Sequence, residues 1–176
     1  GFPITGFSKA FEFIGGGRIW GIPFMIYMLV IAAILSHFIL DKTKLGRYIY
    51  ATGGNERAAI ASGINVTKVR LFVYSFAGAM SGLAGILLTS RLLTAQPSAA
   101  MGYELDAIMA AVIGGTGLSG GTGSIWGTLI GALIVGILNN GMDLLQVSPY
   151  WQQVARGMII ILAILSDSLR KPGGGR

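Results

Sequence analysis

The chain contains no cysteine and a single histidine, His37. A disulfide framework, a thiolate zinc site and a cysteine nucleophile are therefore excluded, because each of them needs a cysteine sulfur. One histidine is also too few for a multi-histidine metal site. We expect no metal and no cofactor, and we interpret His37 as a packed or interfacial residue at the inner end of a membrane span.

Charge is scarce as well. Only 11% of the 176 residues are charged, against about 25% in an ordinary soluble domain. Hydrophobic residues make up 53% of the chain, and the mean hydropathy is +0.69. Too few polar side chains are present to cover a soluble surface. The composition therefore predicts a membrane protein.

The positive charge is concentrated in two segments. Residues 41–70 hold six of the 13 basic residues against two acids, and the last ten residues hold three more. Basic loops stay on the cytoplasmic face during membrane insertion, so we expect residues 41–70 and 167–176 to be cytoplasmic. Nucleic-acid binding is disfavoured because it needs a soluble basic face.

Long uncharged stretches predict an all-α, polytopic membrane protein. A helix rises about 1.5 Å per residue, so about 20 apolar residues cross a hydrocarbon core of about 30 Å. We expect about four membrane-crossing elements, one of them broken, and an external loop over residues 1–18. The expected membrane elements are residues 19–40, 71–90, 104–116, 124–140 and 150–166.

The break is expected inside residues 107–142, a long uncharged stretch with six glycines between 114 and 123. Each glycine lowers helix propensity by about 1 kcal/mol relative to alanine. An even number of crossings must separate the two cytoplasmic segments, so residues 104–116 return inward as a half-helix and the glycines form its inner turn. Irregular backbone at membrane depth is tolerated only where it is buried in protein or lines a polar cavity.

Residues 54–63 predict a two-turn helix in the cytoplasmic segment. Asn55 is suited to cap its N-terminus, Glu56 falls in its first turn, and Gly63 favours its end. A helix this short is marginal in water on its own. Two interpretations stay open from these residues alone, a helix that docks in the groove of a partner and an ordinary amphipathic loop.

Several ordered motifs resemble a known family. Residues 46–66 read Gly-Arg-x-x-x-Ala-x-Gly-Gly-Asn-x-x-Ala-Ala-x-x-Ser-Gly-Ile-x-Val, and Gly114-Gly115-Thr116, Leu138-Asn139-Asn140-Gly141 and Ser148-Pro149-Tyr150-Trp151-Gln152-Gln153 follow in order. This pattern is similar to the ribose-type monosaccharide permeases of bacterial ATP-binding cassette importers, from about Leu45 to Ser168. The resemblance implies the C-terminal half of a permease.

The resemblance also implies partners and a coupling helix. It implies a permease dimer, expected to be a homodimer, with two ATPase subunits and a periplasmic or extracellular sugar-binding protein. Residues 54–63 are similar to the coupling helix that sits on the ATPase. The residues expected to act in this coupling are Gly54, Asn55, Glu56, Ala58, Ala59, Ser62 and Gly63.

A sugar carries no charge, so its pathway needs amides, hydroxyls and aromatic faces instead of a ring of charges. Transport is expected to proceed by alternating access. The expected pathway residues are Thr116, Ser119, Trp126, Asn139 and Asn140. The two asparagines can equally well cap helix carbonyls.

Small residues four apart support close helix packing in lipid. Such faces are Gly78-x-x-x-Gly82 and Gly127-x-x-x-Gly131, and we expect both to pack within one subunit. Glu104 and Asp106 are expected to stabilise the N-terminus of the half-helix. Arg156 is expected to extend outward or to face protein.

Two alternatives from other classes remain. Residues 117–121 match the Gly-x-Ser-x-Gly pattern of serine hydrolases, so one alternative is an intramembrane serine protease, but no histidine base is expected near Ser119. A stand-alone secondary transporter or channel also uses broken helices, yet the charges between 71 and 142 cluster at the expected outer side, which argues against ion coupling. The chain has no Gly-Lys-Ser/Thr phosphate loop, so we expect ATP hydrolysis on partner subunits and no enzyme activity here.

Overall fold

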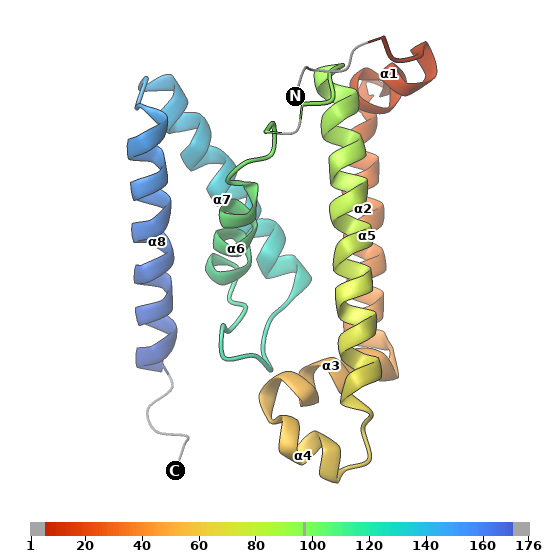
Figure 1. Cartoon of the computed structure of the whole chain (residues 1–176), viewed down its shortest axis with the longest axis vertical. Helices are drawn as coiled ribbons and strands as arrows, with labels where there is room; N and C mark the ends of the chain where they lie inside the picture. Colours follow the sequence, from red (N-terminus) through yellow and green to blue (C-terminus); the bar gives the residue numbers. More distant parts are fainter. Residues whose placement is uncertain (1–5, 97, 171–176) are drawn as a thin grey trace. The chain divides into compact units, whose positions relative to one another are not determined.

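The computed structural model describes residues 6–96 and 98–170. Contacts divide the chain into two compact units. The first takes in residues up to 49 together with 63–101, and the second takes in residues 50–62 together with those from 102 onward. Helices make up most of both units (Figure 1).

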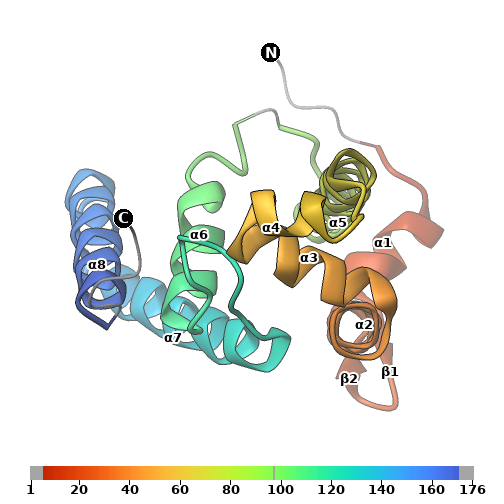
Figure 2. The same cartoon turned by 90° about the horizontal axis from the view of Figure 1, so that it is seen from below.

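The first unit is built on two long helices. Its elements are α1 (Lys9–Gly16), β1 (Arg18–Ile19), β2 (Ile22–Pro23), α2 (Phe24–His37), the π-helical turn η1 (Phe38–Lys42) and α5 (Val66–Leu92). Helix α3 (Lys44–Gly54) follows η1, and its last turn belongs to the second unit. Figure 2 shows α2 and α5 nearly end on, with α1 beside both.

The first span begins later than residue 19. Trp20 and Gly21 both have positive φ, 52° and 82°, and they join the antiparallel strands β1 and β2. The type I′ two-residue hairpin turn needs this left-handed backbone at both positions. The hairpin uses Ile19 and Ile22 as strand residues, so α2 starts at Phe24 and, with η1, runs to Lys42.

Residues 1–18 do not form only a loop, because they contain α1. Ser8 caps this helix by accepting from the Phe11 backbone N–H. The helix packs on α5, where the Ser90 hydroxyl donates to the Phe11 carbonyl and Ser90 is 1% exposed. A Cβ on Gly15 would lie 2.7 Å from the Arg91 Cα, so the two backbones touch. The Ser8 cap and the close approach of α1 to α5 stabilise a helix in a segment that the sequence predicts as a loop.

The second unit holds α4 (Glu56–Ala61), α6 (Tyr103–Ile113), α7 (Ile125–Leu144) and α8 (Pro149–Arg170). Helix α6 contacts both α7 and α8. Met109, Ala110 and Val135 form the core, covered by Ile113, Ile159 and Ile160.

The two glycine faces have different environments. A Cβ on Gly131 would meet the Ala110 backbone of α6, and one on Gly127 would meet Gly114. The prediction that the face on α7 packs within the chain is therefore confirmed. On α5, a Cβ on Gly78 or Gly82 would meet no atom of the described residues within 4 Å.

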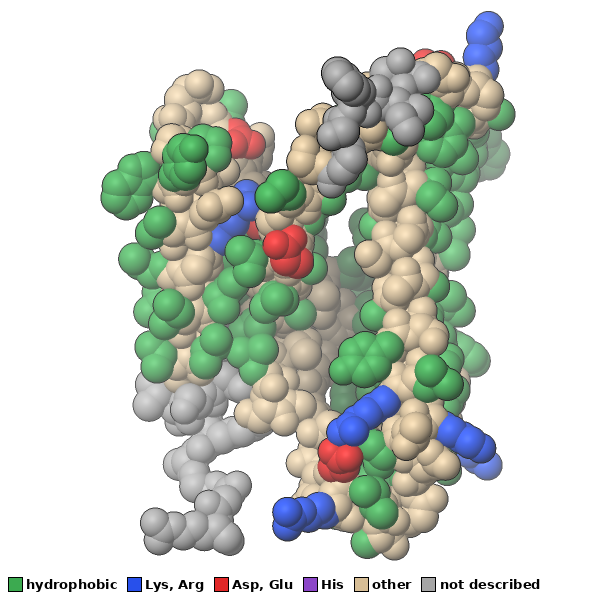
Figure 3. Space-filling model, in the orientation of Figure 1, with side chains coloured by type: hydrophobic (Ala, Val, Ile, Leu, Met, Phe, Trp, Pro, Cys, Tyr) green, Lys and Arg blue, Asp and Glu red, His purple; other side chains and the backbone are tan. Residues whose placement is uncertain are grey.

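Three helical segments of the described chain are long and apolar enough to cross a membrane. They are Phe24–Lys42, Val66–Leu92 and Ile125–Leu144. Their outward surfaces are rich in hydrophobic side chains (Figure 3), including Leu71, Leu133 and Ile137, each at least 68% exposed. Helix α6 has 11 residues, which span only about 16 Å. The predicted all-α polytopic membrane fold is confirmed, with three candidate spans among the described residues where about four crossing elements were expected.

Candidate functional site

Helix α4 forms as the sequence predicts. The Asn55 side chain accepts from the Ala58 N–H at 3.0 Å, which satisfies one of the free amides of the first turn. At the other end, the Ser62 hydroxyl donates to the Ala58 carbonyl at 2.9 Å, and Gly63 has φ +80°. Both ends of a six-residue helix are thus fixed by local bonds.

The two sides of α4 differ in exposure. Ala59 is 3% exposed, whereas the neighbouring Ile60 is 57% exposed. Glu56, Arg57 and Ala58 are exposed as well. A short helix that is held on one side and presents an isoleucine on the other is suited to dock on a protein partner.

The cap of α4 yields a prediction. Asn55→Ala is expected to lower the local stability of α4 by about 1 kcal/mol, so its amides should exchange hydrogen about fivefold faster. Hydrogen exchange of the permease in detergent measures this change. Asn65→Ala is the matched control, because it removes the equivalent 3.0 Å cap of α5 and should leave the exchange of α4 unchanged. Equal exchange of α4 in both variants would contradict the assigned cap.

A glycine loop, defined as residues 114–124, joins α6 to α7. The Gly117 N–H donates to the Thr122 carbonyl at 3.1 Å, and the Gly120 N–H donates to the Gly117 carbonyl at 3.0 Å. Ser124 then caps α7 by accepting from the Gly127 N–H at 3.0 Å. Four glycines of the loop have positive φ, namely Gly115, Gly120, Gly121 and Gly123. The glycines therefore form an ordered turn that other residues would strain.

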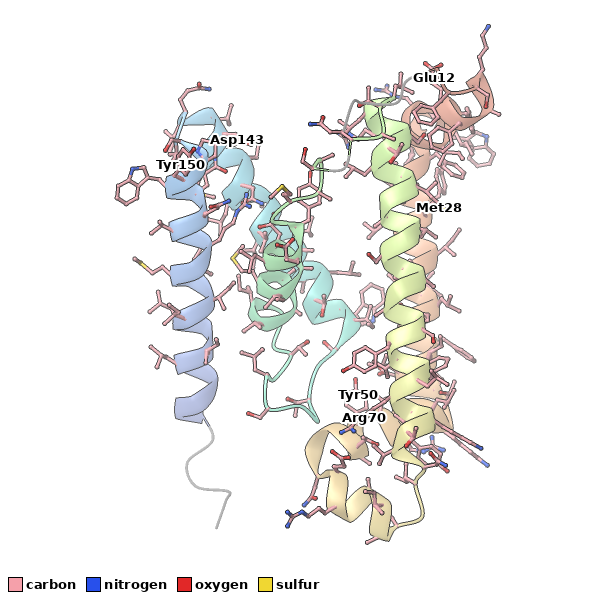
Figure 4. All side chains as sticks on the ribbon, in the orientation of Figure 1. Glu12, Met28, Tyr50, Arg70, Asp143 and Tyr150 are labelled. Carbon is pink, nitrogen blue, oxygen red and sulfur yellow. The ribbon has the colours of Figure 1, made fainter. Side chains whose placement is uncertain are left out.

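The last turn of α3 contacts this loop. The Tyr50 hydroxyl donates to the Gly123 carbonyl at 2.9 Å, and Figure 4 labels Tyr50 beside the loop. Gly53 and Gly54 meet the backbone of Gly120 and Gly121. Helix α3 is absent from the predicted elements, and so is this contact. No local signal in the sequence indicates this contact, because Tyr50 and Gly123 are 73 residues apart.

A polar network links α6, α7 and α8. The Asp106 carboxylate accepts from the Asn139 side-chain amide at 3.0 Å, and its other oxygen lies 3.3 Å from the Arg156 Nε. The side chains of Arg156 and Asp106 are only 15% and 19% exposed. Charged residues of membrane helices usually pair in this way because an unpaired charge is costly there. Arg156 thus faces protein, one of its two predicted positions.

Glu104 and Asp106 have separate roles. Glu104 accepts from the Gly102 N–H at 3.0 Å at the start of α6, as a residue that stabilises a helix N-terminus should. Asp106 also lies in the first turn, but its carboxylate bonds Asn139 and faces Arg156. Only the fold could reveal this difference, because both partners lie on other helices.

The five predicted pathway residues fall into two groups. Thr116, Ser119 and Trp126 belong to the glycine loop and the first turn of α7, and Trp126 is 56% exposed. Asn139 and Asn140 lie 13 residues further along α7, which is about 20 Å along a helix. Asn139 bonds Asp106, while Asn140 is exposed. The structure therefore does not gather the five into one pocket.

The geometry supports neither a hydrolase nor a metal centre among the described residues. Ser119 lies in a loop between two helices, whereas the hydrolase pattern needs a strand-to-helix turn. Among the side chains that the structure describes, no group of three or more His, Cys, Asp or Glu is placed to hold a metal ion.

Comparison with known proteins identifies relatives. The ribose import permease protein RbsC of Haemophilus influenzae is 51% identical over 172 residues, which cover 96% of this chain and 53% of the relative. RbsC of Bacillus subtilis is 53% identical over 169 residues, which cover 95% and 52%. The xylose transport system permease protein XylH of Haemophilus influenzae is 47% identical over 151 residues, which cover 86% and 40%. No solved structure matches the chain.

The chain spans about half the length of the curated relatives it matches. A family model described as the permease component of branched-chain amino acid transport systems matches residues 2–164. The ordered motifs, the helical membrane fold and this match agree. The chain belongs to this family of membrane permease components.

Proposed function

We propose that the chain is a membrane-spanning part of an ATP-driven importer that translocates a monosaccharide such as ribose across the bacterial cytoplasmic membrane by alternating access. The names of similar relatives support a sugar as the transported substrate, because these relatives include permeases for ribose, xylose and allose. ATP hydrolysis takes place on partner subunits. The other partners are a second permease copy, the surrounding lipid and an external sugar-binding protein.

The observation that carries the proposal is helix α4. It is capped at both ends, Ala59 is buried, and Ile60 is exposed. Residues 54–63 form the surface that receives the ATPase, with Asn55 and Ser62 holding the helix and Glu56 and Ala58 on its exposed side. The helix lies in the basic segment 41–70, which faces the cytoplasm together with the C-terminal tail.

The pathway residues act at two levels of the transport route. Thr116, Ser119 and Trp126 offer hydroxyls and an aromatic face near the glycine loop, and Asn139 and Asn140 offer amides near the other end of α7. Two polar levels separated by an apolar helix suit alternating access, because a sugar can leave one before it enters the other.

A segment replacement tests the proposal. Exchanging residues 54–62 for a flexible Gly-Ser linker of equal length removes α4 and is expected to abolish both ATPase association and sugar uptake. Co-purification and radiolabelled sugar uptake measure the two effects. A control permease carries a Gly-Ser linker of equal length in place of residues 171–176. Uptake that persists after α4 is removed, without any bound ATPase, would contradict the proposal and favour a secondary transporter.

A further inference from the structure

The last turn of α3 and the glycine loop touch backbone to backbone. A Cβ placed on Gly53 would lie 2.8 Å from the Gly121 nitrogen, and one placed on Gly121 would lie 2.7 Å from the Gly54 Cα. A Cβ on Gly120 would overlap the Gly53 carbonyl oxygen. No side chain fits between the two segments.

In a main-chain contact of this kind, a displacement of one segment displaces the other by nearly the same amount. Side chains can absorb a movement by changing rotamer, but two close-packed backbones cannot, because a packed protein interior has low compressibility. The Tyr50 hydrogen bond to the Gly123 carbonyl fixes the same contact at its edge. When α3 moves, the loop must therefore move with it.

The loop passes this movement to the half-helix. Gly114 ends α6, and a Cβ on it would lie 2.5 Å from the Gly127 carbonyl carbon in the first turn of α7. The cross-loop bond between Gly117 and Thr122 keeps the loop itself closed. The loop and the adjoining ends of α6 and α7 thus form one tightly packed body.

We propose that four positioning residues couple the α4 segment to the α6–α7 hairpin, namely Tyr50, Gly53, Gly120 and Gly121. A conformational change of the ATPase then reaches the half-helix α6 through the glycine loop. This inference rests on the proposed function. It adds the specific route by which movement of α4 opens or closes the membrane part.

Two helical glycines provide a matched pair of variants. Gly53 lies in α3 and Gly136 lies in α7, and neither has a positive φ. A Cβ on Gly53 would overlap the loop, whereas a Cβ on Gly136 would meet no atom of the described residues within 4 Å. Gly53→Ala and Gly136→Ala therefore make the same chemical change, and only the first displaces the loop.

The experiment uses the whole importer, reconstituted in proteoliposomes with its ATPase and sugar-binding protein. Gly53→Ala is expected to keep the ATPase bound and hydrolysing ATP, while sugar transported per ATP falls about tenfold, within the range that mutations between coupled sites produce. Gly136→Ala is expected to match the wild type. Tyr50→Phe removes the bond to Gly123 without adding volume, and it should lower transport per ATP several-fold.

The outcomes separate this inference from the proposed function. If the wild-type permease binds no ATPase, the proposed function fails. If the wild type couples normally and Gly53→Ala transports as much sugar per ATP as Gly136→Ala, only the inference fails. Should Gly53→Ala not assemble, Tyr50→Phe decides: reduced transport per ATP supports the relay, and unchanged transport overturns it.

Discussion

Replacing Asp106 by alanine is expected to destabilise the second unit by about 3 to 5 kcal/mol, the usual cost of removing one partner of a buried ion pair. Arg156 would keep its charge while losing the carboxylate 3.3 Å away, and Asn139 would lose an acceptor at 3.0 Å. Both remaining side chains would be left inside a helical bundle with low exposure. Denaturant unfolding of the purified permease in detergent micelles measures the loss.

Two variants make this prediction specific. Glu104→Ala removes a nearby carboxylate that bonds only the Gly102 amide in the described residues, so its cost should stay near 1 kcal/mol. The double variant Asp106→Asn with Arg156→Met removes both charges and should recover most of the stability, since a neutral, well-packed pair avoids desolvation. If Asp106→Ala proves as stable as Glu104→Ala, the network does not hold the three helices together.

Gly131→Ala is expected to destabilise the α6–α7 hairpin by about 1 to 3 kcal/mol, as overpacking of a close-packed interior does. Gly131 is buried, and an added methyl group would overlap the carbonyl of Ala110. Because the obstacle is backbone, α6 and α7 have to separate. The midpoint of thermal unfolding in detergent measures the effect.

Gly136→Ala is the control for this substitution on the same helix. Gly136 is exposed, and a Cβ there would meet no atom of the described residues within 4 Å. Alanine also has the higher helix propensity, by about 1 kcal/mol. We expect unchanged or slightly higher stability. Equal destabilisation by both variants would mean that helix propensity outweighs the α6–α7 contact, contrary to the packing described above.

Local signals in the sequence predicted the elements whose bonds are local. Asn55 caps α4 through an amide three residues away, and the glycines end α6 at Gly114. Both effects depend on neighbours in the chain, so composition and spacing suffice to predict them. Helices α1 and α3 were not predicted, because the glycines at their ends lower the helix propensity of these short segments. Tertiary contacts stabilise both helices in the fold.

The spacing of residues along the sequence could not predict the polar network or the contacts of the glycine loop. Asp106 and Asn139 are 33 residues apart, and Tyr50 and Gly123 are 73 apart. Nothing near Asp106 in the chain distinguishes it from Glu104, and the two differ only through what faces them in the bundle.

By itself, then, the amino-acid order determined that the chain enters a membrane, where its helices break and where a short capped helix forms. Those properties follow from side-chain hydration and from bonds between near neighbours. The tertiary structure alone decided that Asp106 pairs with Arg156 and that Gly53 lies against Gly121. Each of these contacts requires two distant segments to approach within bonding distance, and only the packing of the helices brings them there.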